Sequence, residues 1–123
     1  MLFDTFAWIE FFNGTTLGRK VTDLLKHESP ATAMPTLSEL ASWALKNGYD
    51  PGEILSKVAQ ASNILGFNAA VAQLAGELHY KYKKADSSFG MVDSMIYATA
   101  LSYGLKLVTG DPHFKDKPEV VFL

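Results

Sequence analysis

Residues 106–112 read Lys-Leu-Val-Thr-Gly-Asp-Pro, and this stretch decides the fold class. Residues 106–109 form a mainly apolar run of strand length, and the turn sequence that contains Asp111 ends it. The N-terminus has the same order, because the apolar pair at residues 2–3 is followed directly by Asp4. Acidic residues therefore follow predicted strands at two places that lie far apart in the chain.

The chain between these two strands alternates between helical and extended patterns. Apolar spacing and turn residues predict helices at 6–12, 17–26, 36–46, 51–61, 69–83 and 91–103, and further strands at 31–34, 64–65 and 120–122. This alternation predicts an α/β protein: a three-layer α/β/α sandwich around a short, mostly parallel sheet of about five strands. The carboxyl ends of parallel strands share one edge, where such sheets bind ligands, so we expect Asp4 and Asp111 to meet there.

Three helices begin at recognisable capping sequences. Residues 36–39, Thr-Leu-Ser-Glu, have the spacing of a capping box, which places Glu39 in the first turn of its helix. Asp50 before a proline predicts the start of the next helix, and Asn68 caps the helix at 69–83. In this interpretation Glu39 has a structural role without any metal.

Composition limits the class of protein. The 123 residues are 48 % hydrophobic and 20 % charged, which fits one folded domain spanning residues 1–123. The absence of cysteine excludes disulfides and thiolate metal sites and fits a reducing cytoplasm. No window has the length of a membrane span, so we expect a cytoplasmic protein. The net charge of −2 gives no overall attraction for nucleic acid, so an RNA substrate requires bound metal and local lysines.

Two further acids lie near predicted helix starts, beside apolar residues. These are Asp93 and Glu39, and few cationic residues are close to either in the sequence. Buried carboxylates need partners, and one divalent ion would satisfy several of them at once. Oxygen ligands without cysteine or paired histidines favour Mg²⁺ or Mn²⁺ over zinc. Clustered carboxylates with such an ion are typical of metal-assisted phosphodiester hydrolysis.

The order and setting of these acids resemble those of a known family. Four segments carry the resemblance: residues 2–9 (Leu-Phe-Asp-Thr-Phe-Ala-Trp-Ile), 39–40 (Glu-Leu), 92–100 (Val-Asp-Ser-Met-Ile-Tyr-Ala-Thr-Ala) and 107–114 (Leu-Val-Thr-Gly-Asp-Pro-His-Phe). In this order they resemble the PIN-domain nucleases over essentially the whole chain. The similarity is greatest to the toxin component of VapBC-type toxin–antitoxin pairs.

This resemblance implies a Mg²⁺- or Mn²⁺-dependent endoribonuclease that hydrolyses RNA. It assigns the catalytic, metal-binding positions to four acids, with two supporting hydroxyl residues: Asp4, Glu39, Asp93 and Asp111, with Thr5 and Thr109. It also implies an antitoxin partner whose C-terminal segment lies across the active-site groove, and a homodimer. The chain departs from the family at Asn68, where many members carry an acid, and at Gly110, where many toxin-type members carry an arginine.

Other interpretations of the same residues stay open. Asp93 can stabilise a helix dipole and Asp111 can be a turn residue without any metal. His113 is interpreted as a surface or packing residue outside the site. The alternative function is a non-catalytic PIN-like module that binds a metal or a partner, which Asn68 favours. Receiver domains and phosphatases with an aspartate nucleophile fit poorly, because both need a second acid near Asp4.

Overall fold

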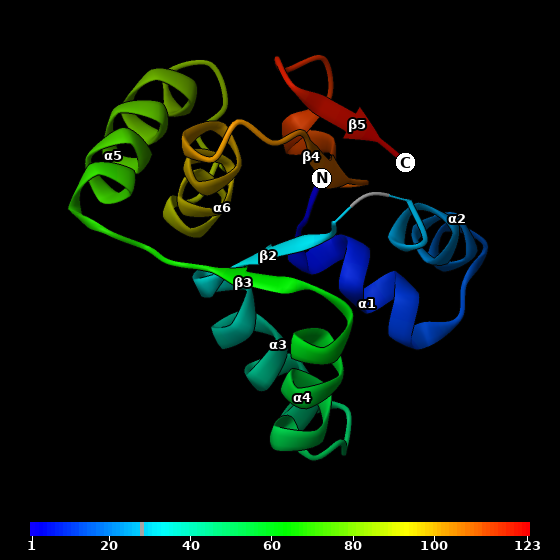
Figure 1. The fold of residues 1–123 in the computed structure, drawn as a ribbon. Coiled ribbons are helices and arrows are strands. Elements are labelled where there is room, and N and C mark those ends of the chain that lie inside the picture. Colours follow the sequence, from blue (N-terminus) through cyan, green and yellow to red (C-terminus); the bar gives the residue numbers. More distant parts are fainter. Residues whose placement is uncertain (28) are drawn as a thin grey trace.

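A five-stranded parallel sheet forms the centre of the protein (Figure 1). The structure is a computed structural model that describes residues 1–27 and 29–123. Its strands, β1 to β5, are Leu2–Phe3, Ala31–Ala33, Asn63–Leu65, Leu107–Thr109 and Val120–Phe122. They lie in the order β3-β2-β1-β4-β5, and every neighbouring pair is parallel. The predicted fold class and the expected number of strands are therefore confirmed.

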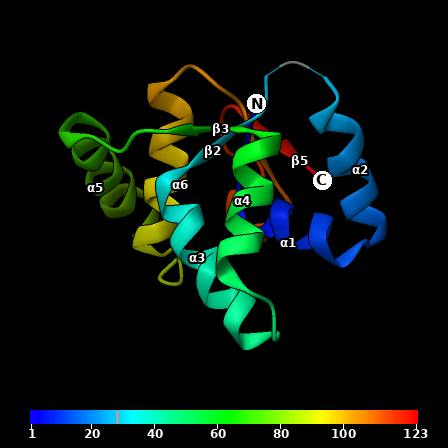
Figure 2. The same cartoon turned by 60° about the horizontal axis from the view of Figure 1, so that its bottom comes forward.

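Six α-helices of the described residues surround this sheet. Helices α1 to α6 are Thr5–Asn13, Thr16–Leu25, Met34–Lys46, Pro51–Ala61, Ala69–Lys83 and Met91–Ser102, and a short 3-10 helix follows at Pro112–Phe114. Figure 2 shows α5 and α6 together at one side of the molecule, away from α2. No helix within the described part of the chain combines the length and the apolar character that crossing a membrane requires.

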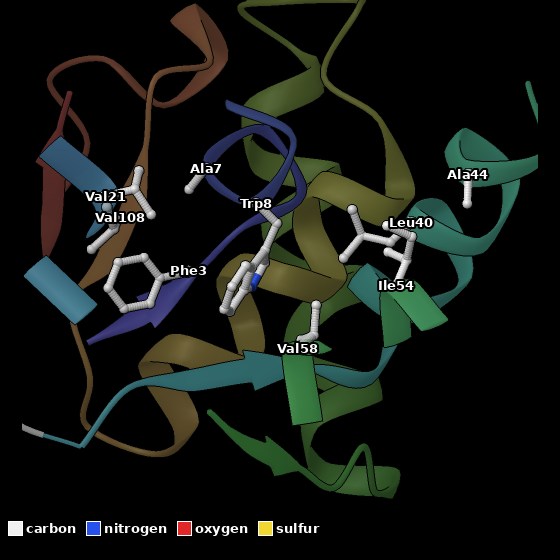
Figure 3. Packing of buried hydrophobic residues seen from close by; sticks show 9 residues of the cluster. All are labelled: Phe3, Ala7, Trp8, Val21, Leu40, Ala44, Ile54, Val58 and Val108. Atoms are coloured by element: carbon white, nitrogen blue, oxygen red, sulfur yellow. The ribbon is translucent and has the colours of Figure 1, made fainter. Parts of the chain in front are cut away.

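Successive residues of each short strand face opposite sides of the sheet, so the core has two halves. Phe3 and Val108 belong to the half covered by α1–α4, where Trp8 is fully buried and its indole N–H donates to the Thr32 hydroxyl at 3.1 Å. Figure 3 shows this half, and its buried members are Phe3, Ala7, Trp8, Val21, Leu40, Ala44, Ile54, Val58 and Val108. The other half forms against α6, with Leu2, Ala33, Phe89, Ile96, Tyr97, Ala100, Leu107 and Phe114.

Most predicted helix ends lie within one residue of the observed ends, but the prediction of a capping box at residues 36–39 is wrong. Helix α3 begins two residues earlier, at Met34, and its N-cap Ala33 makes no side-chain capping bond. Thr36 is completely buried, and its hydroxyl has no hydrogen-bond partner among the described residues. Pro35 fits this earlier start, because proline favours the first turn of a helix. Glu39 is therefore in the second turn and is free to face another part of the fold.

Candidate functional site

The site lies at the carboxyl ends of the central strand β1 and its neighbour β4. The chain builds the sheet outward from β1 through β2 to β3 and then crosses back to place β4 on the other side of β1. Such a reversal leaves a crevice at the carboxyl ends of the two strands, where α/β proteins bind ligands. Asp4 directly follows β1 and Asp111 follows β4 by two residues, as the sequence predicted.

Asp4 is the most buried acid of the site, with 4 % of its surface exposed. It also caps α1, since its Oδ1 accepts a hydrogen bond from the Ala7 N–H at 2.8 Å. Burial, together with repulsion from Asp111 and Asp93, raises the pKa of Asp4 from 3.8 to about 7, although hydrogen bonds from Thr109 and Ala7 oppose the rise. The sequence did not reveal this cap, so Asp4 has a structural role beside any chemical one.

Asp93 approaches the same place from the start of α6. Its Oδ2 accepts a hydrogen bond from the Gly90 N–H at 3.2 Å, which fixes the carboxylate across the first turn of the helix. Burial raises the pKa of this half-buried acid, and the charge of Asp111 adds to the effect. Asp93 therefore lies in the first turn of α6, as the sequence indicated, and its bond to Gly90 is a cap that the sequence analysis did not predict. The capped carboxylate still lies close enough to Asp111 for that charge to raise its pKa.

Asp111 begins the 3-10 helix, and two short-range bonds orient it. Its N–H donates to the Thr109 hydroxyl at 3.0 Å, and its Oδ1 accepts from the His113 N–H at 3.0 Å. Gly110, just before it, packs against the Phe6 ring so closely that an added Cβ would lie 2.4 Å from Phe6 Cε1. Phe6 thus fills the space that a side chain at position 110 would need.

Glu39 joins the site from α3. Its Oε1 accepts a hydrogen bond from the Thr5 hydroxyl at 2.5 Å, which connects the second turn of α3 to the first residue of α1. Burial raises the pKa of Glu39, and repulsion by Asp93 and Asp111 raises it further. The four predicted acids therefore lie close enough together that the charges of Asp93 and Asp111 raise the pKa values of Asp4 and Glu39. The two predicted hydroxyl residues each form a hydrogen bond to one of these acids, Thr5 to Glu39 and Thr109 to Asp4.

His113, which the sequence analysis left outside the site, lies against Asp111 and Asp93. Its Nδ1 is 2.8 Å from Asp111 Oδ1. One ligand atom from each of Asp93, Asp111 and His113 lies within 4.8 Å of the others, a spacing that suits a metal ion. The sequence Asp-Pro-His could have indicated this position of His113. Pro112 starts a tight turn that brings His113 back over Asp111.

The donor set fits a divalent cation. Within residues 1–27 and 29–123, no lysine or arginine forms an ion pair with any of the four acids Asp4, Glu39, Asp93 and Asp111. Carboxylates held this close, and partly buried, repel one another unless protons or a cation neutralise them. Their oxygen atoms are the ligands that Mg²⁺ and Mn²⁺ prefer. Such an arrangement can hold an ion and polarise a phosphate bound beside it.

Comparison with protein families finds one match over almost the whole chain. The family model described as "PIN domain" matches residues 1–120. No curated protein sequence matches the chain.

Solved structures with the same fold come from bacterial toxin–antitoxin complexes. A toxin–antitoxin complex from Klebsiella pneumoniae superposes with a TM-score of 0.78 at 26 % sequence identity, covering 98 % of this chain and 94 % of that one. VapBC2 from Rickettsia felis, bound to a DNA fragment from its promoter, has a TM-score of 0.78 at 20 % identity and covers 99 % and 96 %. DNA-bound VapBC from Salmonella typhimurium has a TM-score of 0.74 at 23 % identity and covers 99 % and 95 %.

Proposed function

This chain belongs to the PIN domain family, and we propose that it is a Mg²⁺- or Mn²⁺-dependent endoribonuclease, the toxin of a toxin–antitoxin pair. Its catalytic, metal-binding residues are Asp4, Glu39, Asp93 and Asp111, with Thr5 and Thr109 in support. It acts as a single domain over residues 1–123, in the cytoplasm.

One observation carries this proposal: carboxylates from four separate segments converge, and no lysine or arginine among the described residues forms an ion pair with any of them. Helix capping alone would not require these four acids to lie near one another. Burial of Asp4 costs free energy when it is charged, and its raised pKa expresses that cost. Charge repulsion of this kind is typical of metal sites and active sites.

The residues have distinct parts in the proposed chemistry. Asp4, Asp93 and Asp111 would hold the ion, and Glu39 would complete its surroundings directly or through water. When bound, such an ion lowers the pKa of a coordinated water and stabilises charge on the phosphate oxygens. Thr5 fixes the Glu39 carboxylate, and Thr109 hydrogen-bonds to Asp4 and Asp111. In-line attack by water at phosphorus breaks the P–O3′ bond, leaving a 5′-phosphate and a 3′-hydroxyl.

The direct test is cleavage of a mixed panel of labelled RNAs by the purified protein, free of any partner, with Mg²⁺ or Mn²⁺ and with EDTA. We expect metal-dependent cleavage that Asp93→Asn abolishes. Asp23→Asn is the matched control, because Asp23 is an exposed acid on α2 with 76 % of its side chain accessible. Metal binding without cleavage of any RNA would instead support the non-catalytic PIN-like module.

An apolar groove beside Glu39 supports the antitoxin part of the proposal. The groove has a volume of about 380 Å³, and its lining residues include Met34, Phe67, Val92 and Met95. Met34 and Val92 are 46 % and 37 % exposed, and Glu39 lines the same groove. An antitoxin segment with apolar side chains and a basic residue would cover this groove and neutralise the acids together.

This partner is tested by co-expression with the product of an adjacent gene. Met34→Glu should weaken the complex by placing a charge in the groove, whereas Leu45→Glu, on the same helix and 69 % exposed, should leave it intact. Equal capture by both variants would contradict this docking surface. The proposed homodimer is tested separately by light scattering of the isolated chain, where a monomer at high concentration would count against it.

A further inference from the structure

The short turn after β4 holds His113 in one position beside the acids. Asp111 caps the 3-10 helix, and its Oδ1 accepts the His113 N–H at 3.0 Å. The ring then lies with Nδ1 at 2.8 Å from the same Oδ1, and it packs edge-on against the buried Phe89. The backbone bond to Asp111 and the contact with Phe89 therefore hold the imidazole beside the acids.

Two residues of the loop before α6 fix the other ring nitrogen. The Ser88 hydroxyl donates to Asp86 Oδ1 at 2.5 Å, since the carboxylate has no proton to give. This bond uses the single hydroxyl proton of Ser88. His113 Nε2 lies 2.9 Å from the same Ser88 oxygen, so Nε2 must be the donor in that contact. Asp86 Oδ2, at 3.7 Å from Nε2, adds a negative charge that favours the same arrangement.

The hydrogen bonds from His113 Nε2 to Ser88 and from Ser88 to Asp86 determine whether Nδ1 can bind a cation. In the tautomer whose single ring proton is on Nε2, Nδ1 has a lone pair. Nδ1 is buried and makes no hydrogen bond to any of the described residues, although Asp111 Oδ1 is only 2.8 Å away. Two lone pairs facing each other at that distance repel, and a cation bound by both atoms would turn this repulsion into attraction.

We propose that His113 Nδ1 is a ligand of the divalent ion held by Asp93 and Asp111. Asp86 and Ser88 are positioning residues that orient the ring. Histidines that bind metal in proteins usually donate their second N–H to a carboxylate or similar acceptor, and the Asp86–Ser88 pair supplies one here. The inference rests on the proposed metal centre and adds a nitrogen donor to a set otherwise made of oxygen atoms.

The test is pulsed electron paramagnetic resonance of the full chain loaded with Mn²⁺, which detects ¹⁴N atoms bound directly to the ion. We expect a nitrogen coupling in the wild type that disappears in His113→Gln, whose amide keeps a contact to Ser88 but places no atom at Nδ1. His27→Gln, which removes an exposed histidine, should keep the coupling. A coupling that is absent from Mn²⁺-bound wild type, or that persists in His113→Gln, would overturn the proposal.

Mn²⁺ affinity, measured by calorimetry, supplies an independent readout. We expect His113→Gln and Asp86→Asn each to raise the Kd for Mn²⁺ by about 10–100-fold. His113→Asn should recover part of the affinity, because its amide oxygen takes the place of Nδ1, yet it should show no coupling from a bound imidazole. Circular dichroism and thermal unfolding check that each variant is folded. Wild-type protein that is folded but binds no Mn²⁺ would overturn the metal centre itself, whereas bound Mn²⁺ without nitrogen would overturn only the role of His113.

Discussion

The metal-free protein should become more stable when Asp4 is replaced by asparagine. The pKa of Asp4 is about 7 in the folded chain and 3.8 in the unfolded chain, so the folded state holds the proton more tightly. A tenfold difference in proton affinity corresponds to about 1.4 kcal/mol. Above pH 7 the charged Asp4 therefore destabilises the metal-free fold by about 4 kcal/mol, and Asp4→Asn removes that cost.

The sign of the pH dependence follows from the same difference. Below pH 3.8 the Asp4 carboxyl is protonated in the folded and in the unfolded chain, and its contribution to the stability of the fold is fully present. This contribution is lost as the pH rises through about 7, the pKa of Asp4 in the folded chain. Glu39 and Asp93 have pKa values raised by burial as well, so they act in the same direction. The wild type in EDTA should be more stable at pH 5 than at pH 8 by about 2–3 kcal/mol, and Asp4→Asn should flatten this slope.

The assay is urea unfolding in EDTA at pH 5 and pH 8, followed by circular dichroism. Asparagine caps helices about as well as aspartate, so the Ala7 hydrogen bond is kept. Asp4→Ala is the matched control: it also removes the charge but loses the cap, which should make it about 1 kcal/mol less stable than Asp4→Asn. If Asp4→Asn were less stable than the wild type at pH 8 without metal, a charged, buried Asp4 would not destabilise the fold.

Three further outcomes are expected. Calorimetry of Mn²⁺ binding near pH 6.5, in buffers of different ionisation enthalpy, should show that about one proton is released, because the metal displaces the proton of Asp4. Binding without proton release would contradict the raised pKa of Asp4. Gly110→Ala should lower the free energy of unfolding by about 1–3 kcal/mol through its clash with Phe6, and Phe6→Leu should relieve part of that loss in a double-mutant cycle. Thr5→Val should slow RNA cleavage by about 10–100-fold by releasing Glu39, and an unchanged rate would show that this bond does not matter.

The sequence predicts the sheet and the two acids at its edge because both depend on local signals. An apolar run followed at once by an acid or a turn defines where β1 and β4 end, and parallel strands bring those ends together. Asp4 and Asp111 could therefore be placed at this edge from the sequence alone. Helix α5 was also predicted correctly, since Asn68 caps it through the Val71 N–H.

What the sequence missed depends on contacts between distant residues. Glu39 has the spacing of a capping box, but Pro35 allows the helix to start two residues earlier. The Glu39 carboxylate instead accepts a hydrogen bond from Thr5, which is 34 positions away. His113 looked like a surface residue because its partner Ser88 is 25 positions away. Gly110 marked a departure from the family pattern, and only the structure shows that Phe6 fills its space.

The rate of RNA cleavage by the wild type and by Asp4→Asn in Mn²⁺, measured on preparations whose stability has been determined, tests most directly whether Asp4 belongs to a catalytic metal centre. We expect cleavage by the variant to fall by about 100-fold or more, while its metal-free fold is more stable than that of the wild type at pH 8. Cleavage at the wild-type rate by Asp4→Asn would contradict the assignment of Asp4 to the catalytic centre.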